Sequence, residues 1–314
     1  MHKRKVGIVG AGAVGATAAF SLVMMGVCSE IVLYDIVEGV AKGKAIDIAQ
    51  AAEYSARPTV VTGAESLDEM EGCDIVVITA GVPRKEGMTR EDLLMINANI
   101  MKDVVSQIAN VAPEAMIICV SNPLDVMNYV IHRMTGWSRH RIVGMAGALD
   151  GARMAYQIYQ TLGYGSGQIG KLVIGDHGQK MIPLPHKVQI EGVNVSDLLT
   201  REQLEGIIER TRNGGAEIVK HLGTSGYYAP GRAVAHMVEA ILDDTKAVVS
   251  CSVLLEGEYG YSDVCVGVPV VLGRNGVEKI IEMPLDDETK AKFDASVRSI
   301  RSGIDVLEAN GFFA

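Results

Sequence analysis

The stretch Val6-Gly7-Ile8-Val9-Gly10-Ala11-Gly12-Ala13-Val14-Gly15 decides the fold of this chain. A short apolar run enters a Gly-x-Gly-x-x-Gly turn that opens a helical pattern, as in a dinucleotide-binding βαβ unit. Gly10 permits the tight turn, Gly12 lets the backbone approach a pyrophosphate, and Gly15 lets helix and strand pack closely. The helix N-terminus offers free N–H groups and a positive dipole end to phosphates. We therefore predict a dinucleotide site at this turn.

Asp35 supplies the second part of this prediction. It ends the next strand candidate, 20 residues after Gly15. A carboxylate there would accept hydrogen bonds from a ribose diol and would repel a 2′-phosphate, so we expect NAD rather than NADP as cofactor. The alternative is an ordinary strand–helix turn in which Asp35 is a capping residue. The glycine spacing and the acid occur together, which favours the dinucleotide site.

The first half of the chain alternates β-rich runs with helical patterns, which predicts a parallel sheet covered by helices on both faces. Six runs match the two halves of a doubly wound (Rossmann) α/β fold. The predicted strands are Val6–Val9, Ile31–Asp35, Thr59–Thr62, Asp74–Thr79, Ile117–Ser121 and Ile142–Gly144, with helices at about 14–26, 38–52, 91–112 and 124–135.

The alternation stops near residue 146, so we expect a dinucleotide-binding domain over 1–146 and an α+β substrate-binding domain over 147–314. No flexible linker is visible between them, which predicts packed rather than tethered lobes. For the second domain we predict strands at 172–174, 187–190, 247–255, 264–272 and 277–281, and helices at about 148–162, 200–221, 231–243 and 286–307.

Composition limits the classes of function. The net charge of −9 argues against a nucleic-acid partner, which would require a basic surface. The five cysteines show no Cys-x-x-Cys spacing, so we expect a reducing cytoplasm rather than a disulfide framework or zinc site. No apolar stretch approaches the roughly 18 residues of a membrane span, and we expect no membrane association.

Three arginines and one histidine carry the chemical information. Arg84 and Arg90 lie six positions apart in a Gly-containing loop, and Arg153 follows Asp150 in the pattern Asp-x-x-Arg. Guanidinium groups bind carboxylates through a planar fork, so the set indicates a small, doubly charged organic acid. Asp150 and Arg153 share one helix face; taken alone, they are better explained as a capped helix with a surface ion pair.

His177 stands in Gly175-Asp176-His177-Gly178 after an apolar strand, with glycines that leave space around its ring. A pairing with Asp150 would fix the tautomer of His177 and stabilise its imidazolium, as a proton shuttle requires. The other histidines lie in no paired motif, and no metal-ligand spacing occurs, so we expect no metal.

Two loops follow predicted strands at the edge where ligands bind in open α/β sheets. Gly81 lies after the fourth strand and would allow close approach of a cofactor. Asn122, in Ser121-Asn122-Pro123, could offer its amide to a nicotinamide ribose or a substrate hydroxyl. Both segments are also ordinary turn sequences, and alone they do not decide between the two interpretations.

These segments together resemble the lactate/malate dehydrogenase family over nearly the whole chain. The matching segments are Gly10–Gly15, Asp35, Thr79–Arg90, Ser121–Pro123, Asp150–Arg153, His177-Gly178 and 267–273. The resemblance implies that His177 is the acid/base, Asp150 its partner and Arg153 the anchor of the C1 carboxylate. It also implies that Arg90 polarises the reacting carbonyl when the loop closes, that Asn122 lines the cofactor and substrate sites, and that Asn97 reaches the cofactor.

Within that family, Arg84 occupies the position that selects the substrate. An arginine there is similar to the malate enzymes, in which it binds the second carboxylate, whereas lactate enzymes typically carry glutamine. The resemblance therefore implies reversible NAD-linked oxidation of (S)-malate to oxaloacetate. The alternatives are an L-lactate or other 2-hydroxyacid dehydrogenase, which Glu86 favours, and a non-catalytic NAD-binding protein. Gln179 also departs from the family pattern, which usually has Asp; Asp176 could compensate for the missing charge.

The resemblance further implies a symmetric homo-oligomer. The chain is closest to malate dehydrogenases built like lactate dehydrogenases, so we expect a tetramer, with a dimer as the alternative. Two apolar helical faces, Ala45–Ala49 and Ile207-Ile208 with Ile218-Val219, offer candidate contact surfaces. They could also pack inside the chain.

Overall fold

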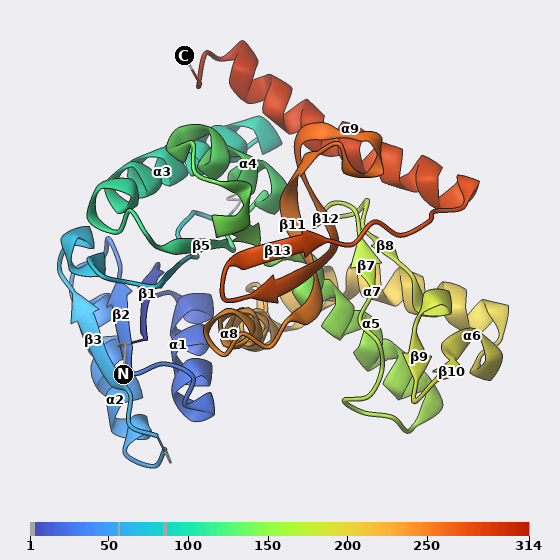
Figure 1. Ribbon diagram of the computed structural model, residues 1–314, viewed down its shortest axis with the longest axis horizontal. Helices are drawn as coiled ribbons and strands as arrows, with labels where there is room; N and C mark the ends of the chain where they lie inside the picture. The colour runs from blue at the N-terminus through green and yellow to red at the C-terminus, as the bar shows by residue number, and fades with distance from the viewer. Residues whose placement is uncertain (1–3, 56, 84–86, 314) are drawn as a thin grey trace.

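The computed structural model describes residues 4–55, 57–83 and 87–313 (Figure 1). The first half builds the alternating strands and helices of a doubly wound fold. Its elements are β1 (Lys5–Val9), α1 (Ala13–Met25), β2 (Glu30–Tyr34), α2 (Val40–Ala52), β3 (Val60–Ala64), η1 (Leu67–Met70), β4 (Ile75–Ile78), α3 (Arg90–Val111), β5 (Met116–Cys119), α4 (Leu124–Thr135), η2 (Arg139–Arg141) and β6 (Ile142–Gly144).

The second half begins with a long helix, α5, and ends with another, α9. Its elements are α5 (Ala146–Leu162), β7 (Val173–Ile174), β8 (Ile182–Pro183), η3 (Pro185–Lys187), β9 (Gln189–Ile190), β10 (Val193–Asn194), α6 (Val195–Leu198), α7 (Arg201–Leu222), α8 (Tyr228–Leu242), β11 (Ala247–Glu256), η4 (Glu258–Gly260), β12 (Ser262–Gly273), β13 (Gly276–Ile280) and α9 (Asp287–Ala309).

Within the described residues, one nine-stranded sheet runs through both halves in the order β13-β12-β11-β6-β5-β4-β1-β2-β3. Strands β1 to β6 pair in parallel. The strands β11, β12 and β13 are antiparallel, and β11 joins the parallel part through the pair Ser252 and Gly144. A Cβ on Gly144 would lie 2.8 Å from the Cβ of Ser252, so glycine allows this close junction.

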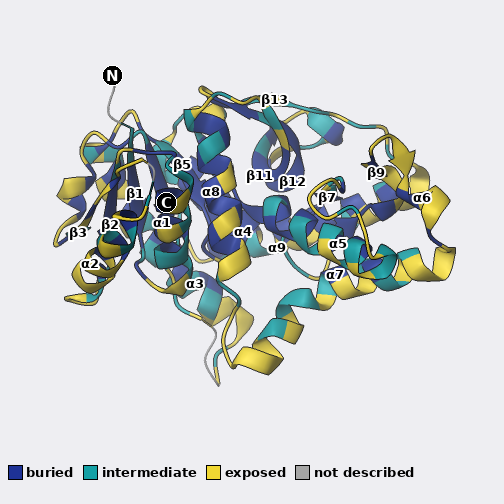
Figure 2. Ribbon diagram, turned by 90° about the horizontal axis from the view of Figure 1, so that it is seen from below, coloured by how far each residue is buried: buried dark blue, intermediate teal, exposed yellow. Residues whose placement is uncertain are grey.

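The helices form two groups on opposite sides of the sheet (Figure 1). One group consists of α3, α4 and α9, and the other of α1, α2 and α8. Most of the strands between them are deeply buried (Figure 2). Parallel strands covered on both faces require continuous apolar sequence rather than alternation, and the fully buried run Ile75-Val76-Val77-Ile78 of β4 has that character.

The two halves share one hydrophobic core, which includes residues of α1, β4, α8, β12 and α9. Helix α8 from the second half packs closely on α1, because a Cβ on Gly231 would lie 2.8 Å from the backbone nitrogen of Ala18. A smaller core lies under α5 and α7. The shared core therefore holds the two halves at a fixed distance from each other.

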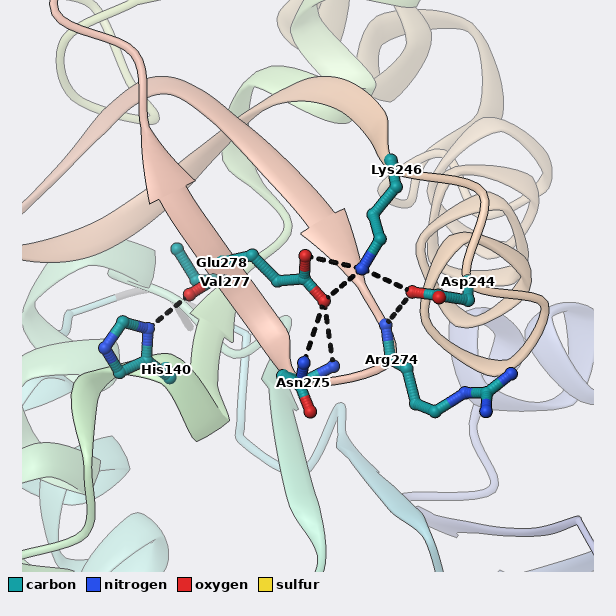
Figure 3. Close-up of polar contacts among 7 residues, drawn as sticks. All are labelled: His140, Asp244, Lys246, Arg274, Asn275, Val277 and Glu278. Atoms are coloured by element: carbon teal, nitrogen blue, oxygen red, sulfur yellow. Dashed lines mark hydrogen bonds and ion pairs between the residues drawn. The ribbon is translucent and has the colours of Figure 1, made fainter.

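An exposed polar network joins the α8–β11 turn to the β12–β13 hairpin (Figure 3). Lys246 Nζ lies 2.6 Å from both carboxylate oxygens of Glu278 and 2.7 Å from Asp244 Oδ1. The Arg274 amide donates to the same Asp244 oxygen, and His140 Nδ1 contacts the Val277 carbonyl oxygen. Such exposed pairs contribute little energy individually. Their effect is to fix the hairpin that closes one edge of the sheet.

The predicted fold class is confirmed, and the strands predicted for the first half are present with ends shifted by at most two residues. Several features of the second half were not predicted. Strands β8 and β10 and the short helix α6 were missed, and α8 begins three residues before the predicted start at 231. The continuation of the parallel sheet into β11–β13 was also missed, because strand pairing between the halves leaves no local signal.

The two apolar helical faces proposed as contact surfaces contain both buried and exposed residues. Ala45 and Ile48 pack inside the chain, as does Ile207. Ile46 and Val219 remain exposed at 53% and 43%. The central residues of both faces therefore pack inside the chain. The apolar area that these two faces leave exposed for a contact with a second copy is smaller than expected.

Candidate active site

The glycine turn has the geometry that a dinucleotide site requires. Gly10 has a φ of 103°, and a Cβ there would lie 2.5 Å from Thr79 Oγ1. A Cβ on Gly15 would lie 1.9 Å from the Gly10 carbonyl oxygen. Gly12 is different: it is the N-cap of α1, has no side-chain cap, and faces space with no described atom within 4 Å of a Cβ. The free N–H groups of α1 thus open onto room for an anion.

Asp35 has a structural role in addition to the predicted one. Its Oδ2 accepts a hydrogen bond from the Ala11 amide at 2.8 Å, and its Oδ1 accepts one from the Val37 amide at 2.9 Å. The acid at the end of β2 therefore holds the glycine turn directly, as the capping alternative predicted. A carboxylate has about four acceptor positions, so both oxygens retain capacity for a ribose diol.

Asn97, for which a cofactor contact is expected, has hydrogen bonds to the protein backbone. It is 3% exposed, and its side chain is hydrogen-bonded to the backbone of two loops. Oδ1 accepts from the Val82 amide at 2.8 Å, while Nδ2 donates to the Asn122 carbonyl at 2.8 Å and to the Val82 carbonyl at 3.2 Å. Gly81, with a φ of 153°, packs against this amide. Asn97 therefore joins the loop after β4 to the loop after β5.

The loop after β5 presents Asn122 to the same edge of the sheet. Its side chain is exposed, while the neighbouring Ser121 is buried and donates to the Ala80 carbonyl. Ser121 thus connects the two loops a second time, and Asn122 is left available for a ligand. Sequence reasoning placed both loops at this edge but could not distinguish which side chains support it and which face outward.

Arg90 is exposed at the first position of α3. A cation is disfavoured at a helix N-terminus, where the dipole is positive, so its place there has no stabilising explanation. The capping box of Thr89 and Asp92 supplies the helix start instead. Arg84, the proposed specificity residue, lies outside the described residues, as does Glu86.

Asp150, Arg153 and His177 form one connected group. His177 Nδ1 lies 2.7 Å from Asp150 Oδ2, and Arg153 NH1 lies 2.9 Å from Asp150 Oδ1. Because a carboxylate can only accept, Nδ1 of His177 carries the proton and Nε2 is the nitrogen that can exchange one. Asp150 lies in the second turn of α5, which begins at Ala146, and it is 1% exposed. The alternative of a capping residue in a surface ion pair is therefore wrong.

Arg153 keeps binding capacity. Its Nε is buried and has no hydrogen-bond partner among the described residues. The guanidinium lies against α7 at two glycines, and its NH2 would be 3.5 Å from a Cβ on Gly215. A buried donor without a partner costs free energy until an acceptor arrives. Arg153 is thus prepared for an anion, and the glycines that make room for it were not predicted.

The charges around His177 set its proton affinity. Burial lowers the pKa of His177, but the Asp150 carboxylate outweighs this effect and the net pKa is above 6.5. Burial, and to a smaller extent the nearby Asp125, raise the pKa of Asp176 to about 7. Asp176 therefore carries only part of a charge near neutral pH, which weakens the compensation for Gln179 that the sequence suggested.

Asp125 was missed at the sequence level. It lies in the first turn of α4, is 4% exposed, and its Oδ2 accepts the backbone N–H of His177 at 2.7 Å. Burial raises the pKa of its carboxyl. The available signal was an acid at the start of a helix that otherwise faces the core, a feature that does not identify the partner of the acid.

Other ligand classes find little support in the part of the chain that the structure describes. There, no three His, Cys, Asp or Glu side chains are grouped as metal ligands would be. No helix in this part combines the length and apolar character needed to cross a membrane.

A doubly wound sheet with a free helix N-terminus at its glycine turn, in the same chain as a buried His–Asp–Arg group, defines an NAD-dependent oxidoreductase of small carboxylates. Residues 4–144 match the NAD binding domain of lactate/malate dehydrogenase, and residues 147–310 match the alpha/beta C-terminal domain of the same family.

Known proteins resemble the chain over nearly its full length. Malate dehydrogenase of Sulfurimonas denitrificans is 55% identical over 99% of this chain and 98% of that protein. The crystal structure of Cryptosporidium parvum malate dehydrogenase superposes with a TM-score of 0.94 at 38% identity, covering 98% of this chain and 99% of that one. The lactate dehydrogenase of that organism, complexed with lactic acid and the cofactor β-nicotinamide adenine dinucleotide, gives 0.93 at 34% identity with the same coverage. The chain belongs to the lactate/malate dehydrogenase family.

The glycine turn leads to a prediction with two matched variants. Gly12→Ala should leave the unfolding midpoint nearly unchanged, because space is open there, yet weaken NADH binding about tenfold or more, as the methyl group enters the phosphate site. Gly15→Ala should destabilise the fold by about 3 kcal/mol, because its Cβ meets backbone. Fluorescence titration with NADH and thermal unfolding measure both effects. Wild-type NADH affinity in Gly12→Ala would contradict the assignment.

Asp176 predicts a pH-dependent stability. The pKa of the Asp176 carboxyl rises from 3.8 to about 7 on folding. The contribution of this group to the free energy of unfolding is therefore fully present below about pH 4 and is lost as the pH rises toward 7. Asp176→Asn removes this loss and should raise the unfolding midpoint near pH 8 by several degrees more than near pH 4. Asp305→Asn, on an exposed position of α9, controls for the loss of one negative charge. Equal effects of Asp176→Asn at the two pH values would refute the assignment.

Proposed function

We propose that this chain is an NAD-dependent malate dehydrogenase, which interconverts (S)-malate and oxaloacetate. The observation that carries the proposal is the shared Asp150 carboxylate, with His177 at 2.7 Å on one oxygen and Arg153 at 2.9 Å on the other. This arrangement supports a proton carrier and a carboxylate anchor at adjacent positions. The malate dehydrogenases that match the chain over almost its full length support the same reaction.

The acid/base role belongs to His177. In the oxidation of malate, Nε2 takes the proton of the C2 hydroxyl while Asp150 stabilises the resulting imidazolium. In the reverse direction, the protonated ring returns that proton to the carbonyl oxygen of oxaloacetate. The raised pKa of His177 serves the second direction, because it keeps more of the ring protonated near neutral pH.

The substrate carboxylates are assigned to arginines. Arg153 binds the C1 carboxylate, which gives its buried Nε a partner. Arg84 binds the second carboxylate, and Arg90 polarises the reacting carbonyl. Both assignments rest on the resemblance of their loop to the family; Arg90 is also exposed at a position that has no structural explanation.

The cofactor NAD, when bound, accepts or supplies the hydride at the nicotinamide. The glycine turn of Gly10, Gly12 and Gly15 would hold its pyrophosphate, and Asp35 its ribose. Gly81 and Asn122 would line the nicotinamide side. We assign Asn97 to the support of these two loops, since its side chain is committed to their backbone.

A non-catalytic NAD-binding protein would require His177 to be separate from Asp150, and the 2.7 Å contact speaks against it. The lactate or 2-hydroxyacid alternative depends on Arg84 and Glu86 and is decided by assay. A boundary at residue 146, between a dinucleotide-binding domain and a substrate domain, is also part of the proposal. A cytoplasmic location is supported by five buried free cysteines.

We also propose a homotetramer, with the dimer as the alternative. Exposed apolar side chains lie on neighbouring helices: Phe20 and Met24 on α1, Ile46 on α2 and Tyr228 on α8. An apolar surface of this kind is suited to a symmetric contact with a second copy.

The substrate prediction is tested by comparing oxaloacetate with pyruvate in the presence of NADH. We expect a higher kcat/KM for oxaloacetate, because pyruvate would leave Arg84 without a partner, at a cost of several kcal/mol. Arg84→Gln should reduce oxaloacetate turnover far more than pyruvate turnover. Lys85→Gln removes a neighbouring charge of the same loop and serves as the control. A pyruvate preference in the wild type would refute the proposal, and equal losses in Arg84→Gln would refute the role of Arg84.

The cofactor prediction is a preference for NADH over NADPH in kcat/KM, because Asp35 repels a 2′-phosphate. Asp35→Asn keeps an acceptor for the Ala11 amide and removes the charge, so it should narrow the preference without loosening the turn. Asp35→Ser should narrow it and also weaken binding of both cofactors. Equal use of the two cofactors by the wild type would contradict the assignment.

The assembly prediction is a tetramer in solution at micromolar concentration, measured by light scattering. Phe20→Asp and Ile46→Asp each place a charge on the exposed apolar surface and should reduce the mass of the assembly. A wild-type mass near that of the single 33.5 kDa chain would refute any homo-oligomer.

A further inference from the structure

The loop that carries His177 is held from several sides. Upstream, Gly175 and Gly267 of β12 exchange two backbone hydrogen bonds of 2.9 Å. Ser296 of α9 accepts from the Asp176 amide and donates to the Lys180 carbonyl. Asp150 of α5 contacts the His177 ring. All these elements belong to the second half of the chain, so they fix His177 relative to the substrate anchor Arg153.

Asp125 comes from the other half. It lies at the start of α4, three residues after Asn122, and its Oδ2 accepts the His177 amide at 2.7 Å. Its burial is expensive for an acid and is not needed for a favourable helix start, because an exposed acid also interacts with the dipole. The carboxyl is therefore placed where it holds the backbone of the histidine.

We propose that Asp125 is a positioning residue that fixes His177 relative to the nicotinamide side of the cofactor site. The inference rests on the proposed function in one respect, the acid/base role of His177. The two residues that make these contacts are only three positions apart in the chain. Asn122 would line the cofactor site, and Asp125, at the start of α4, holds the backbone amide of His177. The hydride and the proton are transferred at adjacent substrate atoms. A shift of about 1 Å between the nicotinamide site and the His177 ring can therefore cost 10²-fold in rate.

Several groups surround the Asp125 carboxyl. Burial raises its pKa, and this effect outweighs Ser252 of β11 and the His177 amide, which lower the pKa; Asp150 raises it as well. Oδ1 has no hydrogen bond of normal geometry within the described residues. Asp176 and the thiols of Cys119 and Cys265 also interact with this charge. In its ionised form Asp125 raises the pKa of His177, so its effect extends to protonation as well as position.

The test uses the full-length enzyme, NADH and oxaloacetate, with the single-turnover rate of NADH oxidation as readout. Asp125→Ala should reduce this rate about 100-fold, with NADH affinity changed less than about threefold. Asp125→Asn keeps an acceptor for the His177 amide and should recover most of the rate. Ser296→Ala removes an anchor of the same loop that comes from the second half, and it should cost less than about tenfold.

The pH profile supplies a readout that a purely structural role would not move. Oxaloacetate reduction requires protonated His177, so its rate falls as pH rises through that pKa. Asp125→Asn removes a charge that raises the pKa and should shift this limb to lower pH. If Asp125→Ala does not fold, Asp125→Leu, which has a similar size and no acceptor, takes its place: a wild-type rate in folded Asp125→Leu overturns the proposal.

The remaining outcomes are also decisive. Equal rate losses in Asp125→Ala and Ser296→Ala would mean that general loop stiffness matters rather than the tie to the cofactor half, and would overturn the inference. A wild-type rate in folded Asp125→Ala would do the same. Absence of oxaloacetate reduction in the wild type would instead refute the proposed function, so the two failures are distinguishable.

Discussion

The contact between the His177 imidazole and the buried Asp150 carboxylate is the interaction on which the site depends. A carboxylate at 1% exposure is costly unless charged or polar partners surround it. Here His177 and Arg153 occupy its two oxygens. The same interaction fixes the ring tautomer, keeps the pKa of His177 above its ordinary value, and places the imidazole next to a guanidinium. Removal of one member would leave the other two with altered charge and orientation.

The fold organises this group by placing its parts on different elements that share one sheet. Asp150 and Arg153 lie on α5, directly after β6, and His177 follows β7. The antiparallel extension β11–β13 continues the parallel sheet, and β12 pairs with the backbone just before His177. The loops after β4 and β5 and the loop that carries His177 are thereby attached to a single layer, and the shared hydrophobic core resists relative movement of the two halves.

Much of this could be predicted from sequence, for a physical reason. Gly10, Gly12 and Gly15 meet the local requirements of a tight turn and a closely packed helix. His177 lies near glycines after an apolar strand. A short stretch of sequence is therefore enough to predict the roles of these residues. Supporting contacts are different. Asn97 bonds to residues 15 and 25 positions away, and Asp125 to a residue 52 positions away. A buried amide or acid on a helix looks the same in sequence whatever its partner, and so the roles of these residues required the structure.

The central claim is that Asp150 holds His177 in a form ready to donate its proton. The direct measurement is an NMR titration of the His177 imidazole in uniformly ¹⁵N-labelled protein, assigned with His177→Gln and repeated in Asp150→Asn. The account predicts a wild-type pKa above 6.5, with Nδ1 protonated in the neutral ring, and a lower pKa in Asp150→Asn. A wild-type pKa at or below 6.5, or the same value in both proteins, would contradict it.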